Sequence, residues 1–149
     1  RQYALGQQHK HLPEMQKIAG LAQPPVFNPI IGDFYAGMVV TIPLHTHLLH
    51  KYSDAKSLHS FFHEFYAGQE LVKVQPFGAE GYLPEGMLGA DALAGRDDAQ
   101  LYICGGEERV ILAARLDNLG KGASGAAIQC MNIALGLPEA QGLVTAPLT

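Results

Sequence analysis

Three glycines near the end of the chain, Gly120, Gly122 and Gly125, form the pattern G-x-G-x-x-G. They follow an apolar run from Val110 to Leu116 and precede a helical pattern, which is the local context of a dinucleotide-binding fingerprint. That fingerprint also needs a complete strand–helix–strand unit after it, and only 24 residues follow Gly125. A dinucleotide-binding unit cannot be completed in that space. We therefore interpret the glycines as small residues that let a helix lie close to neighbouring backbone.

The composition is that of a globular domain. The chain has 149 residues, 48% of them hydrophobic and 16% charged, which is enough to bury a core as one domain. Ten basic and fourteen acidic residues give a net charge of −4 without a basic cluster, so we expect no nucleic acid and no membrane among its partners. No apolar run approaches the ~20 residues that cross a bilayer. Two cysteines are too few for a disulfide framework, and we expect a cytoplasmic protein.

The pattern of apolar residues and turn residues predicts strands interspersed with helices. A short helix is expected over residues 12–19. Pro13 suits its first position, Glu14 faces the positive end of the helix dipole, and Gly20 ends it. Strands are expected over residues 26–31, within 37–49, and over 71–74, 99–104 and 109–116.

The clearest helix follows Ser53 or Asp54, either of which can cap it. Its apolar residues share one helical face and are Leu58, Phe61, Phe62 and Phe65. A closing helix is expected over about residues 120–135. With a hairpin turn at Gly105 and Gly106, these elements predict an α+β fold, a mixed and largely antiparallel sheet with helices on one face.

Seven histidines raise the question of a metal site. Six of them form pairs at spacings that can share a face, namely His9/His11, His45/His47 and His59/His63. No cysteine or carboxylate stands at a matching spacing, so we expect no functional metal.

Two separate stretches point to one protein family. Residues 9–15 read His-Lys-His-Leu-Pro-Glu-Met, with Tyr3 upstream, and residues 117–129 begin Asp-Asn-Leu-Gly-Lys-Gly. They resemble, respectively, the His-basic-His-x-Pro-Glu motif and the last helix of N-acetyl-gamma-glutamyl-phosphate reductases, which are related to aspartate-semialdehyde dehydrogenase. With residues 136–139 (Gly-Leu-Pro-Glu) and 142–143 (Gly-Leu), the resemblance runs from one end of the chain to the other.

The resemblance implies a glyceraldehyde-phosphate-dehydrogenase-like C-terminal domain. Residues 1–116 would be the substrate-binding and dimerisation domain. Residues 117–149 would be a helix and tail that return to a Rossmann cofactor domain, which this chain lacks. The implied partners are that N-terminal domain, a small-molecule substrate and further copies in a homo-oligomer.

The implied activity is an NADP-dependent reduction of N-acetyl-glutamyl 5-phosphate to N-acetyl-glutamate 5-semialdehyde, a step in arginine biosynthesis. In this family a cysteine thiolate forms a thioester with the substrate, and a histidine serves it as acid and base. The first histidine of the motif, His9, takes that role here, for which an imidazole suits because it titrates near neutrality. Tyr3, Lys10 and His11 are the implied substrate-binding residues. Lys10 replaces the usual Arg, which keeps the charge but loses the bidentate fork.

The resemblance also implies cofactor contacts near the last helix. Asn118 would reach the nicotinamide of NADP, and Lys121 would offer charge to a phosphate. From the residues alone, a helix cap at Asp117 or Asn118 is an equally good interpretation, and a lone lysine is commonly just solvated.

The nucleophilic cysteine of the family has no counterpart here. Cys104 lies in an apolar strand pattern and Cys130 lies in the closing helix, so we expect both to be small buried hydrophobic residues. Because the chain also begins with Arg1 rather than Met, we expect a fragment that is inactive alone. Two alternatives stay open, a non-catalytic oligomerisation or ligand-binding module and a metal-binding protein.

Overall fold

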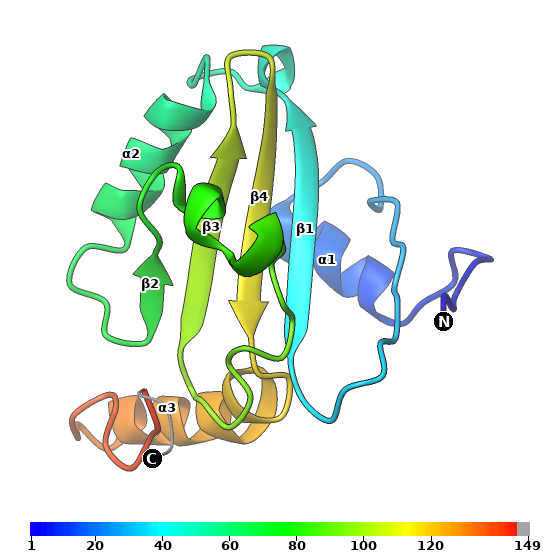
Figure 1. The fold of residues 1–149 in the computed structure, drawn as a ribbon. Helices are drawn as coiled ribbons and strands as arrows, with labels where there is room; N and C mark the ends of the chain where they lie inside the picture. Colours follow the sequence, from blue (N-terminus) through cyan, green and yellow to red (C-terminus); the bar gives the residue numbers. More distant parts are fainter. Residues whose placement is uncertain (146–149) are drawn as a thin grey trace. The chain divides into compact units, whose positions relative to one another are not determined.

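The computed structural model describes residues 1–145, and the chain divides into two compact units, Arg1–Phe34 and Tyr35–Thr149. Figure 1 shows their helices and strands. None of the helices in the described part is long and apolar enough to cross a membrane.

The first unit joins the N-terminal residues to the segment around Phe27 and contains one helix. Gln2 forms an isolated antiparallel bridge with Ile30. The side chain of Gln7 donates to the backbone O of Phe27 (2.7 Å) and accepts from its N–H (2.9 Å). Helix α1 (His11–Ala19) ends at Gly20, which adopts a left-handed conformation (φ 63°) that glycine takes without strain. The predicted first helix is therefore confirmed.

The strand predicted over residues 26–31 is wrong. Only Ile30 pairs there, in the single bridge to Gln2. Pro24, Pro25 and Pro29 remove backbone N–H donors from this segment, so a regular ladder cannot form along it.

The second unit is built on a four-stranded sheet (Figure 1). Its strands are β1 (Met38–His45), β2 (Val72–Val74), β3 (Ala99–Gly105) and β4 (Arg109–Leu116), in the spatial order β1-β4-β3-β2. Strands β3 and β4 form a hairpin, β1 pairs antiparallel with β4, and β2 alone pairs parallel, with β3. The predicted α+β fold with a mixed, largely antiparallel sheet is confirmed.

Helix α2 (Ala55–Phe65) covers part of one sheet face. Asp54 caps it, because its Oδ1 accepts from the backbone N–H of Ser57 (2.7 Å), and this hydrogen bond lowers the pKa of the Asp54 carboxyl. Four buried side chains join the helix to β3 and β4, namely Ala55, Leu58, Ile103 and Val110. Phe65, which the periodicity placed on the same apolar face, is 66% exposed and does not join this core.

The closing helix begins with one π-helical turn, Gly120–Ser124, and continues as α3 (Gly125–Ala134). It therefore spans nearly the predicted range. Short 3₁₀ turns occupy Thr46–Leu48, Ala79–Tyr82 and Pro84–Gly86.

Candidate active site

The histidine motif forms an aromatic cluster within the first unit. His9 is half-buried, and its ring centroid lies 5.6 Å from Tyr3, 5.0 Å from Phe27 and 4.8 Å from His11. The structure therefore brings together three of the four residues expected to act on a substrate. The fourth, Lys10, is exposed at the residue that precedes α1.

One hydrogen bond sets the orientation of the His9 ring. Its Nδ1 accepts from the backbone N–H of His11 (3.2 Å). A nitrogen that accepts carries no hydrogen, so the neutral ring in this arrangement has its hydrogen on Nε2. The Nε2 edge is the one left to meet a ligand.

His11 has a carboxylate partner of its own. Its Nδ1 lies 3.0 Å from Oε2 of Glu14, one helical turn along α1, and both side chains are exposed. The i, i+3 spacing of His11 and Glu14 places both side chains on one helical face and so orients His11, and Glu14 also lies in the first turn of α1.

Asp117 is the residue that organises the start of the closing helix. It is buried, and Oδ1 accepts from the backbone N–H groups of Leu119 (2.7 Å) and Gly120 (3.2 Å) while Oδ2 accepts from that of Gly95 (2.6 Å). Burial raises the pKa of this carboxyl, but the three backbone donors outweigh it and hold the pKa below its usual range. Asp117, and not Asn118, is therefore the residue that caps this segment.

Asn118 is exposed and makes a different contact. Its Oδ1 accepts from the backbone N–H of Gly37 (2.8 Å), at the start of β1. Lys121 is half-buried, and its ammonium donates to Oε1 of Gln129 on α3. These two candidate cofactor residues lie in the second unit, and the histidine cluster lies in the first.

The glycine pattern packs against the same chain. An added Cβ at Gly120 would collide with the carbonyl oxygen of Arg96, and one at Gly125 would lie 2.8 Å from Cγ of Asp97. These glycines let the closing helix approach the Arg96–Asp97 segment, as their small size suggested. Gly125 thus packs against Asp97 of the same chain.

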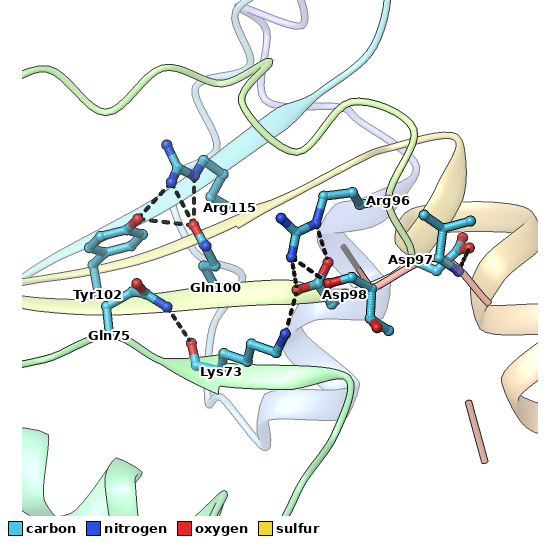
Figure 2. Close-up of polar contacts among 10 residues, drawn as sticks. Lys73, Gln75, Arg96, Asp97, Asp98, Gln100, Tyr102 and Arg115 are labelled. Carbon is cyan, nitrogen blue, oxygen red and sulfur yellow. Dashed lines mark hydrogen bonds and ion pairs between the residues drawn. The ribbon is translucent and has the colours of Figure 1, made fainter. Parts of the chain in front are cut away.

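Buried charges beside this segment connect it to the sheet and to the tail (Figure 2). Asp98 is fully buried, and Arg96 donates to both of its carboxylate oxygens (2.7 and 2.6 Å) while the ammonium of Lys73 lies 3.4 Å away. The hydrogen bond to Asp98 raises the pKa of Arg96. Asp97 and Val144 exchange two hydrogen bonds (2.7 and 2.9 Å), which fixes the tail. This cluster is structural, because its charges are paired inside the protein.

A second polar cluster lies on the sheet itself (Figure 2). Arg115 donates to the Oε1 of Gln100 and to the hydroxyl of Tyr102 (2.7 Å), across the β3–β4 pairing. Burial raises the pKa of Tyr102, which therefore stays a neutral donor to Gln100 (3.0 Å).

The two cysteines differ in their surroundings. Burial, with a smaller effect from Glu80, raises the pKa of Cys104 to about 11, so the thiol stays protonated at neutral pH. Cys130 is exposed on α3, so the expectation that it is a small buried residue is wrong. Within residues 1–145 no three His, Cys, Asp or Glu side chains are grouped as metal ligands would be. His45 and His47 (ring centroids 5.3 Å apart) and His59 and His63 (6.1 Å) remain pairs.

Sequence reasoning missed two residues of this region. Gly37 supports Asn118 from 81 positions away, and nothing local in the sequence reveals that contact. Asp97 could have been noticed, since Arg96-Asp97-Asp98 is a charged cluster directly before an apolar strand.

Comparison with known proteins agrees with the resemblance of the two motifs. Residues 1–118 match the family described as "Semialdehyde dehydrogenase, dimerisation domain". The chain is 44% identical over 144 residues to N-acetyl-gamma-glutamyl-phosphate reductase 2 of Nostoc sp.. The aligned residues cover 95% of this chain and 45% of that protein. The reductase of Trichormus variabilis is 43% identical with the same coverage, and that of Brucella ovis is 43% identical over 136 residues (90% of this chain, 43% of that protein).

The chain thus spans less than half the length of these curated relatives. The family match covers most of the chain, including the histidine motif and the whole sheet. The chain therefore belongs to the semialdehyde dehydrogenase dimerisation-domain family and is related to the N-acetyl-gamma-glutamyl-phosphate reductases.

Proposed function

We propose that this chain is the substrate-binding and dimerisation half of an NADP-dependent reductase that acts on N-acetyl-glutamyl 5-phosphate in arginine biosynthesis. The observation that carries the proposal is the cluster of Tyr3, His9 and His11, in which His9 is held by one ring nitrogen with the other left for a ligand. The names of the Nostoc and Brucella relatives supply the substrate. We place the protein in the cytoplasm, as a homo-oligomer through the domain named for dimerisation.

His9 is the proposed acid and base. In the arrangement described, its neutral ring donates from Nε2 and can hydrogen-bond to a substrate oxygen. Proton exchange at Nε2 requires a hydrogen on Nδ1. The Nδ1 atom then no longer accepts the hydrogen bond from the backbone N–H of His11 while His9 works as acid or base. That hydrogen bond joins two neutral groups and contributes about 1 kcal/mol, so breaking it in each turnover adds little to the barrier.

The neighbours of His9 are suited to bind an anionic substrate. Tyr3 presents a hydroxyl, Lys10 an exposed ammonium, and His11 a ring oriented by Glu14. The substrate carries a carboxylate and a phosphate, which such donors bind well. Because Lys10 lacks the planar fork of an arginine, we assign it general charge attraction and not a bidentate clamp.

Asn118 and Lys121 are the proposed contacts to NADP, which supplies the hydride when bound. Both side chains have donor groups with which to bind the dinucleotide. Asn118 is exposed, and its contact with Gly37 uses Oδ1 and not the NH₂ group. Lys121 gives one bond to Gln129, and an ammonium has three donors. We further propose that residues 117–149 pack on the cofactor domain of the full-length enzyme.

The full-length protein that contains this chain provides the test. Purified, it should reduce NADP when given N-acetyl-glutamate semialdehyde and phosphate, and omission of phosphate should stop the reaction. Aspartate semialdehyde in place of the acetylated substrate should give a much lower kcat/KM. Dimer formation without turnover on either aldehyde would reject the enzyme and favour a non-catalytic module.

A further inference from the structure

The amide of Asn118 has a fixed orientation. A backbone N–H can meet only an acceptor, so the 2.8 Å contact with Gly37 identifies the atom facing β1 as Oδ1 and the outer atom as Nδ2. Among residues 1–145, Nδ2 makes no hydrogen bond, and the side chain is exposed. The residue therefore presents an NH₂ group, and not a carbonyl, to whatever lies beyond it.

Gly37 is itself held rigidly. Its φ of 128° lies in the region that favours glycine, and an added Cβ would collide with the carbonyl oxygen of Ala90 and lie 2.7 Å from Cα of Asp91. The N–H that meets Asn118 thus comes from backbone pressed against another loop. On the other side, Asp117 fixes the backbone next to Asn118 through its three hydrogen bonds.

We propose that Gly37 is a positioning residue, which locks the Asn118 amide so that Nδ2 donates to a carbonyl oxygen of the ligand. This rests on the proposed function, in which that oxygen belongs to the carboxamide of the nicotinamide. A free asparagine amide flips between two orientations, one of which would offer an oxygen to another oxygen and repel it. The Gly37 bond removes that wrong orientation before the ligand arrives, so less ordering remains to be done on binding.

Equilibrium binding to the full-length protein tests the donor. Isothermal titration calorimetry compares NADP with its thionicotinamide analogue, in which a poorly accepting sulfur replaces the carboxamide oxygen. The unmodified protein should bind NADP about 5- to 10-fold more tightly than the analogue, as one hydrogen bond allows. Asn118→Asp keeps the acceptor that faces Gly37 but has no donor, so it should bind both dinucleotides within about twofold of each other.

Gly37→Ala tests the positioning role. It should reduce the preference for NADP over the analogue to within about twofold, as in Asn118→Asp. The double variant Gly37→Ala/Asn118→Asp should show no smaller preference than either single variant, because the two residues act as one unit. Gln69→Glu makes the same amide-to-carboxylate change in an exposed loop and should keep the full preference. Asn118→Asp should keep its Tm, whereas a residue that only stabilises the fold would change Tm and leave the preference intact.

Three results would overturn the inference. They are an unchanged preference in Asn118→Asp, an unchanged preference in a folded Gly37→Ala, or equal binding of the two dinucleotides by the unmodified protein. If the protein turns over N-acetyl-glutamate semialdehyde while any of these holds, the proposed function stands and only this inference fails. A protein that binds neither dinucleotide contradicts both.

Discussion

At the scale of single residues, the proposed chemistry depends most on His9. Replacing His9 with Ala in the full-length enzyme should lower kcat by on the order of 10²–10⁴, the usual contribution of a positioned acid or base. The fold should survive, because the His9 side chain is only half-buried and its ring makes a single hydrogen bond to backbone, from the N–H of His11. Steady-state kinetics and a thermal melt on the same sample give both readings.

A matched control for this variant is His63→Ala, which removes an exposed histidine on α2. It should leave kcat within about twofold of the original, since surface changes away from a site act weakly. An equal loss of kcat in both variants, or an unfolded His9→Ala with no selective effect on rate, would refute the acid/base assignment.

The residue scale is also where sequence reasoning was most and least effective. The family motif named Tyr3, His9 and His11 as site residues, and in the structure their rings lie together. The capping question at residues 117 and 118 could not be decided, because both side chains are good caps. The partner of Asn118 is the backbone N–H of Gly37, directly before β1, and only the fold brings Gly37 there.

At the scale of elements, Asp117 should make the closing helix sensitive to acid. Asp117→Asn should lose on the order of 1–3 kcal/mol of unfolding free energy at pH 7, because its amide places a donor against one of three backbone N–H groups. The native pKa is lowered, so this stabilisation is present above the ordinary value of 3.8 and disappears as the pH falls through the native pKa.

The measurement is urea unfolding of both proteins between pH 7 and pH 3. The stability difference between them should shrink below about pH 4, where the carboxyl of the unfolded chain is protonated. Asp33→Asn, at an exposed carboxylate, should match the original protein throughout. A constant difference across the whole range would show that Asp117 does not stabilise the helix as a carboxylate.

The glycine pattern makes a second prediction for this element. Gly125→Ala should destabilise the protein by about 1–3 kcal/mol, although alanine is the better helix former, because the new Cβ would crowd Asp97. Gly122→Ala is the matched variant, since its Cβ would meet neighbours only at 3.3 Å. Chemical unfolding should show a clearly larger loss for residue 125, and equal losses would contradict the packing role.

The elements that sequence predicted well are those with strong local signals. The Asp54 cap and the apolar spacing of α2, and the Gly105 turn between β3 and β4, each carry their information within a few residues. The segment over residues 26–31 failed because its apolar residues suggested a strand while its prolines removed the donors that a ladder needs. The exposure of Phe65 was not predicted, because periodicity shows which residues share a helical face but not how much of that face other elements cover.

At the scale of the whole molecule, the outer surface of α3 calls for a partner. Met131, Ile133 and Leu135 are 51%, 59% and 65% exposed, and Cys130 is exposed beside them. Apolar side chains gathered on one helix are costly in water and commonly mark an interface. Packing of this helix on the cofactor domain of the full-length enzyme, which we propose, would cover them.

We propose that this chain holds the acid/base and substrate residues of the reductase and that the nucleophile lies elsewhere in the full-length protein. The most direct measurement is reductase activity with N-acetyl-glutamate semialdehyde, NADP and phosphate, for residues 1–149 alone and for the full-length protein. We predict no turnover by residues 1–149 alone, because the Cys104 thiol stays protonated, and full activity from the full-length protein. Turnover by residues 1–149 at the rate of the full-length enzyme would contradict this prediction.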